Sequence, residues 1–373
     1  MFKPKTFYFH KNTKNSVLYN HIIKANPQLK DVIEISTNTR VTDPKYNLIS
    51  HDPKDYYIEK STKIALLDRN CEWGLDPNGR STDFLPSQMM ARSCAYHCTF
   101  CFTNRHFPNG FLKIYNDSYK VVELAKYISD NHDMVKAKFM AECGKHLEKD
   151  RDPKHPNAIT LDLGCDEDYL YHSTITMHDN FPGHYIDIMN KIGEIPGVMT
   201  SFATKCAEVD NLIKFTKDPS KHRVRLSLSP EEHRKTLEKN TSPIVNRLSA
   251  INKLVDAGFE VHINLSPVVV TDNFVQEYND LLKLVNESLS DKAKQQMAYE
   301  IIFLTHSKSE FIPIQNLNKK AHDMMVNGPL SLEPKLNKPN VLSYSRKDKN
   351  DLKTIMSNLI NINTPYSRIR YMF

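Results

Sequence analysis

The sequence lacks the features that mark several large classes of protein. It has no run of 18 apolar residues, so no membrane-spanning helix is expected, and its first residues lack the apolar stretch of a secretory leader. No internal repeat or long low-complexity tract occurs. Its seven cysteines are an odd number in a long chain, which does not fit a secreted disulfide framework. We therefore expect an intracellular protein of the reducing cytoplasm.

The charge balance and the length of the chain set broader limits. A formal net charge of +6 and a pI near 8.7 permit an anionic partner, including nucleic acid, without requiring one. A chain of 373 residues can bury a large core. This length suits one large domain of the α/β barrel type with smaller extensions better than two equal domains.

One short loop contains three of the seven cysteines. Cys94, Cys98 and Cys101 follow the spacing C-x3-C-x2-C. Three thiolates in one loop can hold a cubic [4Fe-4S] cluster and leave its fourth iron without a protein ligand. The alternative is a structural zinc site completed by His97 or His106, but such sites usually pair two C-x2-C halves that lie far apart in sequence. The loop therefore favours an iron–sulfur cluster.

The cysteine loop resembles that of the radical S-adenosyl-L-methionine (radical SAM) superfamily. In that superfamily the free iron chelates the amino and carboxylate groups of S-adenosyl-L-methionine (SAM), and an electron from the cluster cleaves the sulfonium. The resemblance implies that Cys94, Cys98 and Cys101 bind the cluster and that SAM is the second cofactor. It also implies an external electron donor of the flavodoxin or ferredoxin type.

Apolar runs typical of strands alternate with amphipathic stretches after the cysteine loop. This alternation is typical of repeated βα units and predicts a partial (β/α)6 barrel of the α/β class. We expect the barrel at residues 84–310, an N-terminal extension at 1–83 and a substrate-binding C-terminal extension at 311–373. The predicted strands are 88–92, 158–163, 198–203, 223–228, 260–265 and 298–303. The predicted helices are 119–130, 185–192, one that begins at 209, 243–257 closed by Gly258, and 274–285.

Several candidate residues lie at or near the ends of the predicted strands, namely Cys94, Cys165, Lys205 and Ser227, and in barrels of this kind the loops after the strands carry the chemistry. Cys165 directly follows strand 158–163, so its thiol could donate a hydrogen atom to a carbon radical; the alternative is a small buried packing residue. A carboxylate of the run 166–168 could accept the ammonium group of SAM, or be ordinary loop charge. Lys205 and Ser227 stand where a methionyl carboxylate or a ribose could bind, or they serve surface and packing roles.

Taken in order, further motifs resemble the spore photoproduct lyase family, whose members revert a thymine dimer lesion in DNA. The likeness covers roughly residues 55 to 310, with a weaker echo at both ends. Its main parts are a T-K-x-E-x-V-D-like stretch at 201–210 and an R-x-R-x-S strand at 223–227. The other landmarks are 60–62, 238–242 (E-x-x-T-S), 247–250 (R-L-x-A), 257–258 (A-G) and 266–267 (A-P-like).

The family resemblance implies a role for each candidate residue. SAM would be cleaved to a 5′-deoxyadenosyl radical that takes a hydrogen atom from a thymine-derived carbon. Cys165, in the position of the family's C-x-x-D loop, would quench the product radical. Asp168, Lys205 and Ser227 would bind SAM, and the backbone of Phe100 would lie beside the adenine. Reaching a base inside a duplex requires extruding it or bending the DNA.

The sequence departs from the family pattern in the cysteine loop. The family has tyrosines just before and just after the third cysteine, which are implicated in passing a hydrogen atom back toward SAM. Here these positions are Phe100 and Phe102, which have no O–H bond to give. Either another residue serves instead, with Tyr96 as a candidate, or SAM is consumed as a cosubstrate.

A second departure lies near the C-terminus. The run 335–344 replaces a hairpin rich in Gly, Tyr and Arg that wedges the damaged DNA open in the family. The basic residues in and after this run are either phosphate contacts or a solvated tail. They are Lys335, Lys338, Arg346, Lys347 and Lys349.

Three functions follow from these observations. The first is a radical SAM lyase that repairs a thymine dimer in DNA. The second is a radical SAM enzyme that remodels a hypermodified thymine in DNA, which the loss of the two tyrosines favours. The third is a non-catalytic nucleic-acid-binding protein whose cysteine loop holds a structural metal. The thiol and the polar groups at the strand ends suit a cofactor-filled cavity better than a purely structural metal site, which disfavours the third function. Repair of a thymine dimer by carbon–carbon bond scission is the most economical interpretation and is our preferred hypothesis.

Overall fold

The structure, a computed structural model, divides the chain into two compact units. It describes residues 2–36, 63–67, 84–86, 91–101, 112–138, 155, 157–307, 318–335 and 338–373. Unit 1 comprises Met1–His97, His106–Thr204 and Glu208–Val224, and unit 2 comprises Cys98–Arg105, Lys205–Ala207 and Arg225–Phe373. Each unit has its own buried core.

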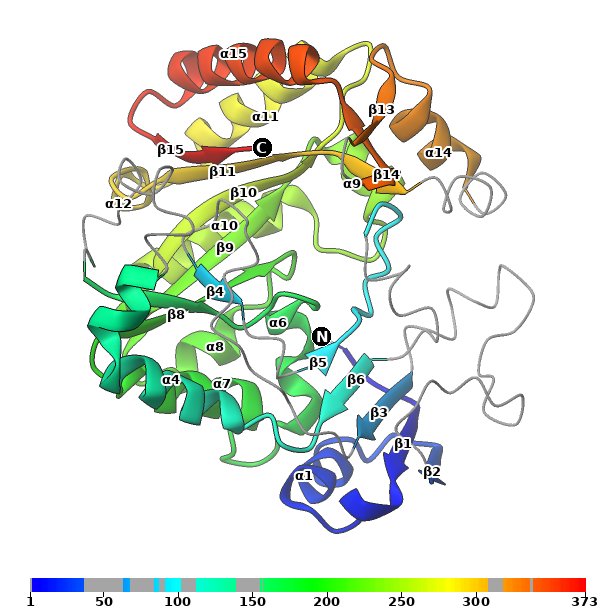
Figure 1. Ribbon diagram of the computed structural model, residues 1–373, viewed down its shortest axis with the longest axis vertical. Coiled ribbons are helices and arrows are strands. Elements are labelled where there is room, and N and C mark those ends of the chain that lie inside the picture. Colours follow the sequence, from blue (N-terminus) through cyan, green and yellow to red (C-terminus); the bar gives the residue numbers. More distant parts are fainter. Residues whose placement is uncertain are drawn as a thin grey trace. The chain divides into compact units, whose positions relative to one another are not determined.

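The first sheet of unit 1 is formed by the N-terminal part of the chain. Its elements are β1 (Thr6–His10), η1 (Lys11–Thr13), α1 (Val17–Ala25), β2 (Asp31–Ile35), β3 (Lys63–Leu67), β5 (Ala91–Arg92) and β6 (Leu112–Tyr115). The strand order is β2-β1-β3-β6-β5, with β5 antiparallel to β6 and the other pairs parallel (Figure 1). Helix α1 begins at Ser16, whose hydroxyl accepts a hydrogen bond from the backbone N–H of Tyr19. The helix buries Leu18 and Ile22 in an apolar cluster with Phe7.

The second part of unit 1 is made of parallel strands and the helices that cover them. Its elements are β4 (Phe84–Pro86), α4 (Lys120–Asp130), β7 (Ile159–Asp162), α6 (Tyr169–His172), η3 (Ser173–Thr176), α7 (Gly183–Gly193), β8 (Val198–Thr204), α8 (Asp210–Phe215), η4 (Pro219–Lys221) and the start of β9 (His222–Leu228). Strands β4, β7 and β8 run parallel in this order. Helices α4 and α7 pack side by side and against β8 (Figure 1). Six of the seven residues of β8 are buried, as expected for a strand covered on both faces.

Unit 2 continues the strand and helix pattern. Its elements are α9 (Glu231–Leu237), α10 (Ile244–Asp256), β10 (Glu260–Val268), α11 (Phe274–Ser288), α12 (Asp291–Lys294), β11 (Ala298–Phe303), β12 (Thr305–Ser307), α14 (Lys319–Val326), β13 (Leu332–Lys335), β14 (Lys338–Tyr344), α15 (Arg346–Asn363) and β15 (Arg368–Met372). Strand β11 lies between β10 and β15 and runs parallel to both. Strands β12, β14 and β13 form a small antiparallel sheet, and α11 packs beside α15 (Figure 1). The complete order of the larger sheet is β15-β11-β10-β9-β8-β7-β4.

The predicted α/β class with a six-strand partial barrel is confirmed. Five predicted strands coincide with β7, β8, β9, β10 and β11, and the predicted helices coincide with α4, α7, α8, α10 and α11. Gly258 has a φ of +97° and closes α10, because its N–H donates to Val255 O (3.0 Å) while Phe259 N–H donates to Leu254 O (3.0 Å). Hydrophobic periodicity therefore located most of the barrel.

The predicted first barrel strand, 88–92, is wrong in its pairing. Residues 88–90 lie outside the described residues, and Ala91–Arg92 form β5, which pairs with β6 in the other sheet. The strand that lies beside β7 is β4, Phe84–Pro86. The two short apolar runs are only a few residues apart, and local sequence does not specify which one pairs with a distant strand.

The sequence also did not predict β15, which joins the barrel sheet from the C-terminal part of the chain. No helix within the described ranges is long and apolar enough to cross a membrane.

Candidate functional site

The residues predicted to act in catalysis lie at the carboxyl ends of the strands and in the cysteine loop. Cys165 lies three residues after the end of β7, Lys205 directly follows β8, and Ser227 is the penultimate residue of β9. Unit 1 contains Cys94, Cys165 and Asp168, and unit 2 contains Cys98, Phe100, Cys101, Lys205 and Ser227. Phe102 lies outside the described residues.

The cysteine loop is a tight turn with reduced thiols. Cys94, Cys98 and Cys101 are all free cysteines, and Cys98 is buried. The backbone N–H of Cys101 donates to Cys98 O (2.9 Å), and Thr99 N–H donates to Leu237 O (2.8 Å) at the end of α9. Burial raises the pKa of the Cys98 thiol to about 12, and nearby Lys205 acts in the opposite direction.

The donor chemistry of the loop fits an iron–sulfur cluster better than a hard cation. Thiolates are the usual ligands of [4Fe-4S] clusters, and none of these three cysteines is in a disulfide. Among the residues that the structure describes, no three His, Cys, Asp or Glu side chains are arranged so as to hold a metal ion. The ligand role of the three cysteines therefore stays a prediction.

Two residues of this loop have a positive φ. Ser93, just before Cys94, has a φ of 82°, and His97, just before Cys98, has a φ of 49°. Residues other than glycine rarely adopt this conformation, and each costs on the order of 1 kcal/mol. The surrounding structure must therefore hold the loop in place through its hydrogen bonds and packing.

In unit 2 the predicted SAM ligand Lys205 belongs to a buried charge network. Its Nζ lies 2.8 Å from Glu238 Oε1 and 4.5 Å from the centre of the Phe100 ring. Glu238 Oε2 accepts a hydrogen bond from Arg247 Nη2 at 3.0 Å. Burial alone would lower the pKa of Lys205, but the interactions with Glu238 and Cys98 raise it by more. The pKa of Lys205 is therefore above its usual value. Burial likewise raises the pKa of Glu238, but Lys205 and Arg247 bring it below the usual value.

Arg247 connects this network to the strand that contains Ser227. Its Nη1 donates to Ser227 O (2.6 Å) and its Nε donates to Ser242 O (2.8 Å). The guanidinium is completely buried. The motif landmarks at 205, 227, 238, 242 and 247 are thus brought together in space. The sequence predicted roles for Lys205 and Ser227 but missed Glu238 and Arg247, which only the family motif could have indicated.

In unit 1 the carboxylate of Asp168 has structural partners. It is the N-cap of α6 and accepts from the backbone N–H of Tyr171 (3.0 Å). The same oxygen accepts from Thr204 Oγ1 (2.6 Å), at the end of β8. Cys165 is partly exposed, and its Sγ lies 3.7 Å from Asp162 O. The sequence did not indicate Thr204 as a partner of Asp168. The N-cap role of Asp168 could have been predicted, because an Asp directly before a short helix is a typical capping signal.

A second buried network in unit 1 surrounds Glu167. Its Oε2 accepts from Tyr185 Oη (2.6 Å) and lies 3.2 Å from His172 Nδ1. The backbone N–H of Ala95 donates to His172 Nε2 (3.2 Å). Burial raises the pKa of Glu167 to about 8 and lowers that of His172 to about 4. No sequence pattern connected these residues, because they come from three separate segments of the chain.

Two aromatic rings stack at Tyr96, the residue after Ala95 in the cysteine loop. Tyr96 stacks on Tyr171, with ring centres 3.9 Å apart and an interplanar angle of 17°. Tyr96 is 3% exposed. The structure thus places Tyr96, which the sequence suggested as a substitute for the missing tyrosines, against a second tyrosine of unit 1.

The inner charges of unit 2 come partly from the R-x-R-x-S strand. Glu300 on β11 is fully buried and accepts from Tyr371 Oη (2.7 Å) and Arg370 Nη1 (2.5 Å). Arg225 Nη1 lies 3.5 Å from Glu300 Oε2, the oxygen that also accepts from Tyr371. Burial raises the pKa of Glu300, but its cationic and hydrogen-bonding neighbours outweigh burial and lower it. Arg225 and Glu300 thus connect β9 to β11 within this unit.

The basic residues near the C-terminus lie on β13, at the start of β14 and on α15. Lys349 is half-buried, and burial is the main cause that lowers its pKa. The like charges of Lys335 and Lys353 lower it further, so the three ammonium groups lie near one another. Arg346 and Lys347 are exposed at the start of α15. Such a concentration of positive charge suits contact with phosphate groups.

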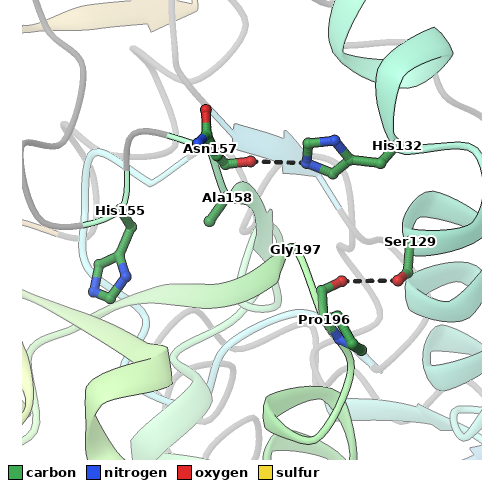
Figure 2. A pocket seen from close by; sticks show the side chains of 7 residues that line it. All are labelled: Ser129, His132, His155, Asn157, Ala158, Pro196 and Gly197. Carbon is green, nitrogen blue, oxygen red and sulfur yellow. Dashed lines mark hydrogen bonds between the residues drawn. The ribbon is translucent and has the colours of Figure 1, made fainter.

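The surface pocket in Figure 2 lies away from the candidate residues. It has a volume of about 390 Å³ and lies where β7 and β8 begin, at the end opposite to Cys165 and Lys205. His132 Nε2 lies 2.7 Å from Asn157 O, and Ser129 Oγ donates to Pro196 O (2.8 Å). Its lining residues are Ser129, His132, His155, Asn157, Ala158, Pro196 and Gly197. None of the predicted site residues lines it.

Buried histidines of unit 1 predict a loss of stability in acid. His184 Nδ1 lies 2.7 Å from Thr176 Oγ1, the side chain is completely buried, and burial lowers its pKa to about 3. The unfolded chain takes up a proton below about pH 6.5 while the folded chain does not, so stability falls as pH decreases from about 6.5 toward 3. The share of His184 is about 3 kcal/mol by pH 4.

The matched variant is His184→Gln, which cannot titrate in this range. Urea unfolding at pH 7 and pH 4 is expected to show a smaller difference in unfolding free energy for this variant than for the unmodified protein, by about the His184 share. His222 is also buried and its pKa is lowered to about 4, so part of the acid dependence remains in the variant. An identical pH dependence for both proteins would contradict the assignment.

The comparison with protein families supports the sequence motifs. The sequence model of the family "Spore photoproduct lyase" matches residues 147–373. A spore photoproduct lyase of Clostridium acetobutylicum is 23% identical over 224 residues, which are 59% of this chain and 57% of that protein. The spore photoproduct lyase of Bacillus subtilis is 27% identical over 101 residues, 27% of this chain and 29% of that protein. The matched segments thus span less than two thirds of either relative.

Solved structures confirm the fold over the whole chain. A spore photoproduct lyase complexed with dinucleoside spore photoproduct superposes with a TM-score of 0.75 at 18% identity and covers 100% of this chain and 99% of that one. A double mutant of the enzyme with bound AdoMet and dinucleoside spore photoproduct gives a TM-score of 0.74 at 17% identity, with the same coverage. These two likenesses extend the shared fold to the cysteine loop, which precedes the segment matched by the family model.

Proposed function

Because this chain belongs to the spore photoproduct lyase family, we propose that it is a radical SAM lyase that repairs a thymine dimer photolesion in DNA. The observation that carries the proposal is the family match over 147–373, which includes Cys165, Asp168, Lys205 and Ser227. The C-x3-C-x2-C loop lies outside that match and supports the proposal independently. A reducing cytoplasm suits both the free cysteines and the oxygen-sensitive chemistry.

The cysteine loop supplies the ligands in this proposal. Cys94, Cys98 and Cys101 would hold a [4Fe-4S] cluster that, together with SAM and an electron from a flavodoxin or ferredoxin, supplies a 5′-deoxyadenosyl radical. The buried position of Cys98 excludes water from that ligand. Its turn is held by Thr99 N–H, which donates to Leu237 O at 2.8 Å.

Residues at or near the strand ends would bind SAM. Lys205 would direct its ammonium group to the methionyl carboxylate, and Glu238 restricts where that ammonium group can lie. Ser227, whose carbonyl is held by Arg247, would hydrogen-bond the ribose or the carboxylate. Asp168 would accept the amino group, and the backbone of Phe100 would lie beside the adenine. Each of these contacts uses a group that the strand ends or the cysteine loop hold at a fixed place.

Cys165 would complete the repair by donating a hydrogen atom. The S–H bond breaks and a C–H bond forms on the product radical, so the unpaired electron passes to the sulfur and Cys165 is left as a thiyl radical. The thiol is partly exposed, so a substrate radical can approach it. The lysines on β13 and α15 would contact the DNA phosphates, which predicts binding that weakens steeply with salt.

Anaerobic reconstitution with iron and sulfide tests this function. The reconstituted protein, SAM, a strong reductant and ultraviolet-irradiated DNA are expected to yield 5′-deoxyadenosine and restored thymine. Untreated DNA serves as the control and should give no restored thymine. A colourless protein that binds zinc and does not cleave SAM would instead support the non-catalytic alternative.

The second candidate function is the remodelling of a hypermodified thymine in DNA. It is favoured by Phe100, which has no hydroxyl and whose ring packs beneath the ammonium group of Lys205. Without a tyrosine at this position, SAM would be consumed in each turnover rather than regenerated. In the same assay, this function predicts SAM cleavage and a new base in modified DNA, with ultraviolet lesions left unchanged.

Replacing Cys165 by alanine separates radical formation from radical quenching. We expect SAM cleavage to continue, because Cys165 is not in the cysteine loop, while clean restoration of thymine stops and side products appear. The measurement is chromatography of 5′-deoxyadenosine and of the digested DNA from one reaction. Cys206→Ala is the matched control, since Cys206 is also a free cysteine but is buried. Normal repair by the Cys165 variant would remove its assigned role.

A further inference from the structure

We propose that Glu167, His172 and Tyr185 form a positioning group that holds the backbone just after Cys94 at a fixed place relative to the loop of Cys165. All three lie in unit 1, and this inference rests on the proposed function only where it concerns the cluster. The group connects the loop that contains a cluster ligand to the loop that contains the hydrogen donor. Neither the family motifs nor the sequence patterns assign a role to His172 or Tyr185, and Glu167 was considered only as one of three carboxylates that could accept the ammonium group of SAM.

The hydrogen bonds of His172 fix its tautomer. Because the backbone N–H of Ala95 can only donate, His172 Nε2 must be the acceptor in their 3.2 Å contact. Nδ1 of the neutral ring therefore carries the proton and donates to Glu167 Oε2, 3.2 Å away. The imidazole thus connects the amide of the residue after Cys94 to a carboxyl group two residues after Cys165.

Glu167 is held by a second donor. The hydroxyl of Tyr185, on α7, donates to the same oxygen at 2.6 Å. The other oxygen, Oε1, has no hydrogen-bond partner in the part of the chain that the structure describes. Tyr185 and His172 are 0% exposed and the Glu167 side chain is 1% exposed, so water does not compete for these bonds. Two donors on one oxygen leave the side chain a single well-defined position.

The loop needs such support because its backbone is strained. Ser93 and His97 have positive φ values on either side of the segment that contains Cys94 and Ala95. Residues other than glycine keep this conformation only where the surroundings enforce it. The amide of Ala95 is bonded to a side chain whose own position is set by two further residues. Loss of that bond would leave the Cys94 segment free to move away from the cluster.

Paired substitutions at His172 and at Glu167 distinguish a role in positioning the backbone near Cys94 from a general contribution to stability. His172→Gln places an amide oxygen near the position of Nε2 and can still accept from Ala95, whereas His172→Asn places its amide near Nδ1 and leaves Ala95 without an acceptor. Glu167→Gln keeps an oxygen that accepts from both His172 and Tyr185, whereas Glu167→Ala does not. His222→Gln is the control, because His222 is a buried histidine of unit 1 that bonds to Thr200 (2.7 Å).

The first readout needs no cofactor. Amide hydrogen exchange of the metal-free protein should show exchange at Ala95 that is at least about tenfold faster in His172→Asn and Glu167→Ala, with little change in the two Gln variants. The second readout is the rate at which reconstituted protein loses iron to a chelator, expected to rise about tenfold in the same two variants, a typical effect of removing an outer partner of a metal ligand.

The two readouts separate the possible failures. If exchange at Ala95 responds as expected but no variant or parent protein binds iron, the proposed function fails while the hydrogen-bonded group stands. If His172→Asn behaves like His172→Gln, or if both change only as much as His222→Gln, the positioning role is refuted. Tyr185→Phe provides a further check when His172→Asn does not fold, since it should accelerate exchange at Ala95 by loosening Glu167.

Discussion

Replacing Cys98 by alanine is expected to give a protein that retains almost no iron after anaerobic reconstitution and cleaves SAM only at background level. Cys98 is the central cysteine of the C-x3-C-x2-C loop and is buried, so no water or neighbouring side chain can readily take its place. A cubic cluster with only two protein thiolates is labile, and its fourth iron then has no defined position. The chemistry of the protein should be lost as a whole.

The iron and sulfide content per chain, the absorbance of the cluster and the yield of 5′-deoxyadenosine measure this effect. Cys206→Ala is the matched control, because Cys206 is a buried free cysteine of the same unit that the motif does not include. The thermal stability of both metal-free variants should remain close to that of the parent, since each substitution removes a single small sulfur group. Full iron content in the Cys98 variant would show that the loop does not hold the cluster.

Hydrophobic periodicity predicted the parts of the fold whose pattern is local. Strands β8 to β11 are buried at all but at most one residue each, and α10 has a regular apolar face ended by Gly258. The pairing of the short strand β4 with β7, and of the distant β15 with β11, was not predictable in this way. Both pairings depend on contacts between residues far apart in sequence, which no local pattern encodes.

In the candidate site, too, features with a local sequence pattern were predictable, whereas contacts between distant residues were not. The cysteine spacing and the positions of Cys165, Lys205 and Ser227 at or near strand ends could be identified along the chain. Their partners could not, because Glu238 lies 33 residues after Lys205 and is brought to it only by the folding of α9 beyond β9. A buried polar group must find a partner, but the sequence does not state which one. The structure therefore contributes most of what is known about how these side chains are held.

The buried charge network around Glu238 predicts the second large effect, which is on stability. Arg247→Met is expected to lower the free energy of unfolding by about 3–5 kcal/mol, because it removes one partner from a buried ion pair. Glu238 would keep Lys205 at 2.8 Å but lose Arg247 at 3.0 Å. Ser227 O and Ser242 O would lose their guanidinium donors as well.

Urea unfolding of the metal-free protein measures this loss. Lys235→Met is the matched control, because Lys235 forms an ion pair with Glu232 on the surface (2.8 Å), and its loss should leave stability unchanged within error. A double-mutant cycle with Glu238→Gln tests the cause: the double variant should be more stable than the sum of the single losses predicts, since a neutral amide no longer needs the guanidinium. If Arg247→Met is no less stable than Lys235→Met, the network does not stabilise the fold.

The same substitution should weaken SAM binding through geometry rather than through direct contact. Arg247 holds the carbonyl of Ser227 and, through Glu238, the ammonium group of Lys205, so both predicted SAM ligands lose a constraint in Arg247→Met. At a urea concentration and temperature where the variant remains folded, we expect the dissociation constant for SAM to rise at least about tenfold, the size of effect seen when the outer partner of a metal ligand is removed. Arg247→Lys is expected to restore part of the stability but not the affinity, because an ammonium group cannot donate to Ser227, Ser242 and Glu238 in the same planar arrangement. Equal SAM affinity in the parent and Arg247→Met would show that Lys205 and Ser227 are placed by the strands alone.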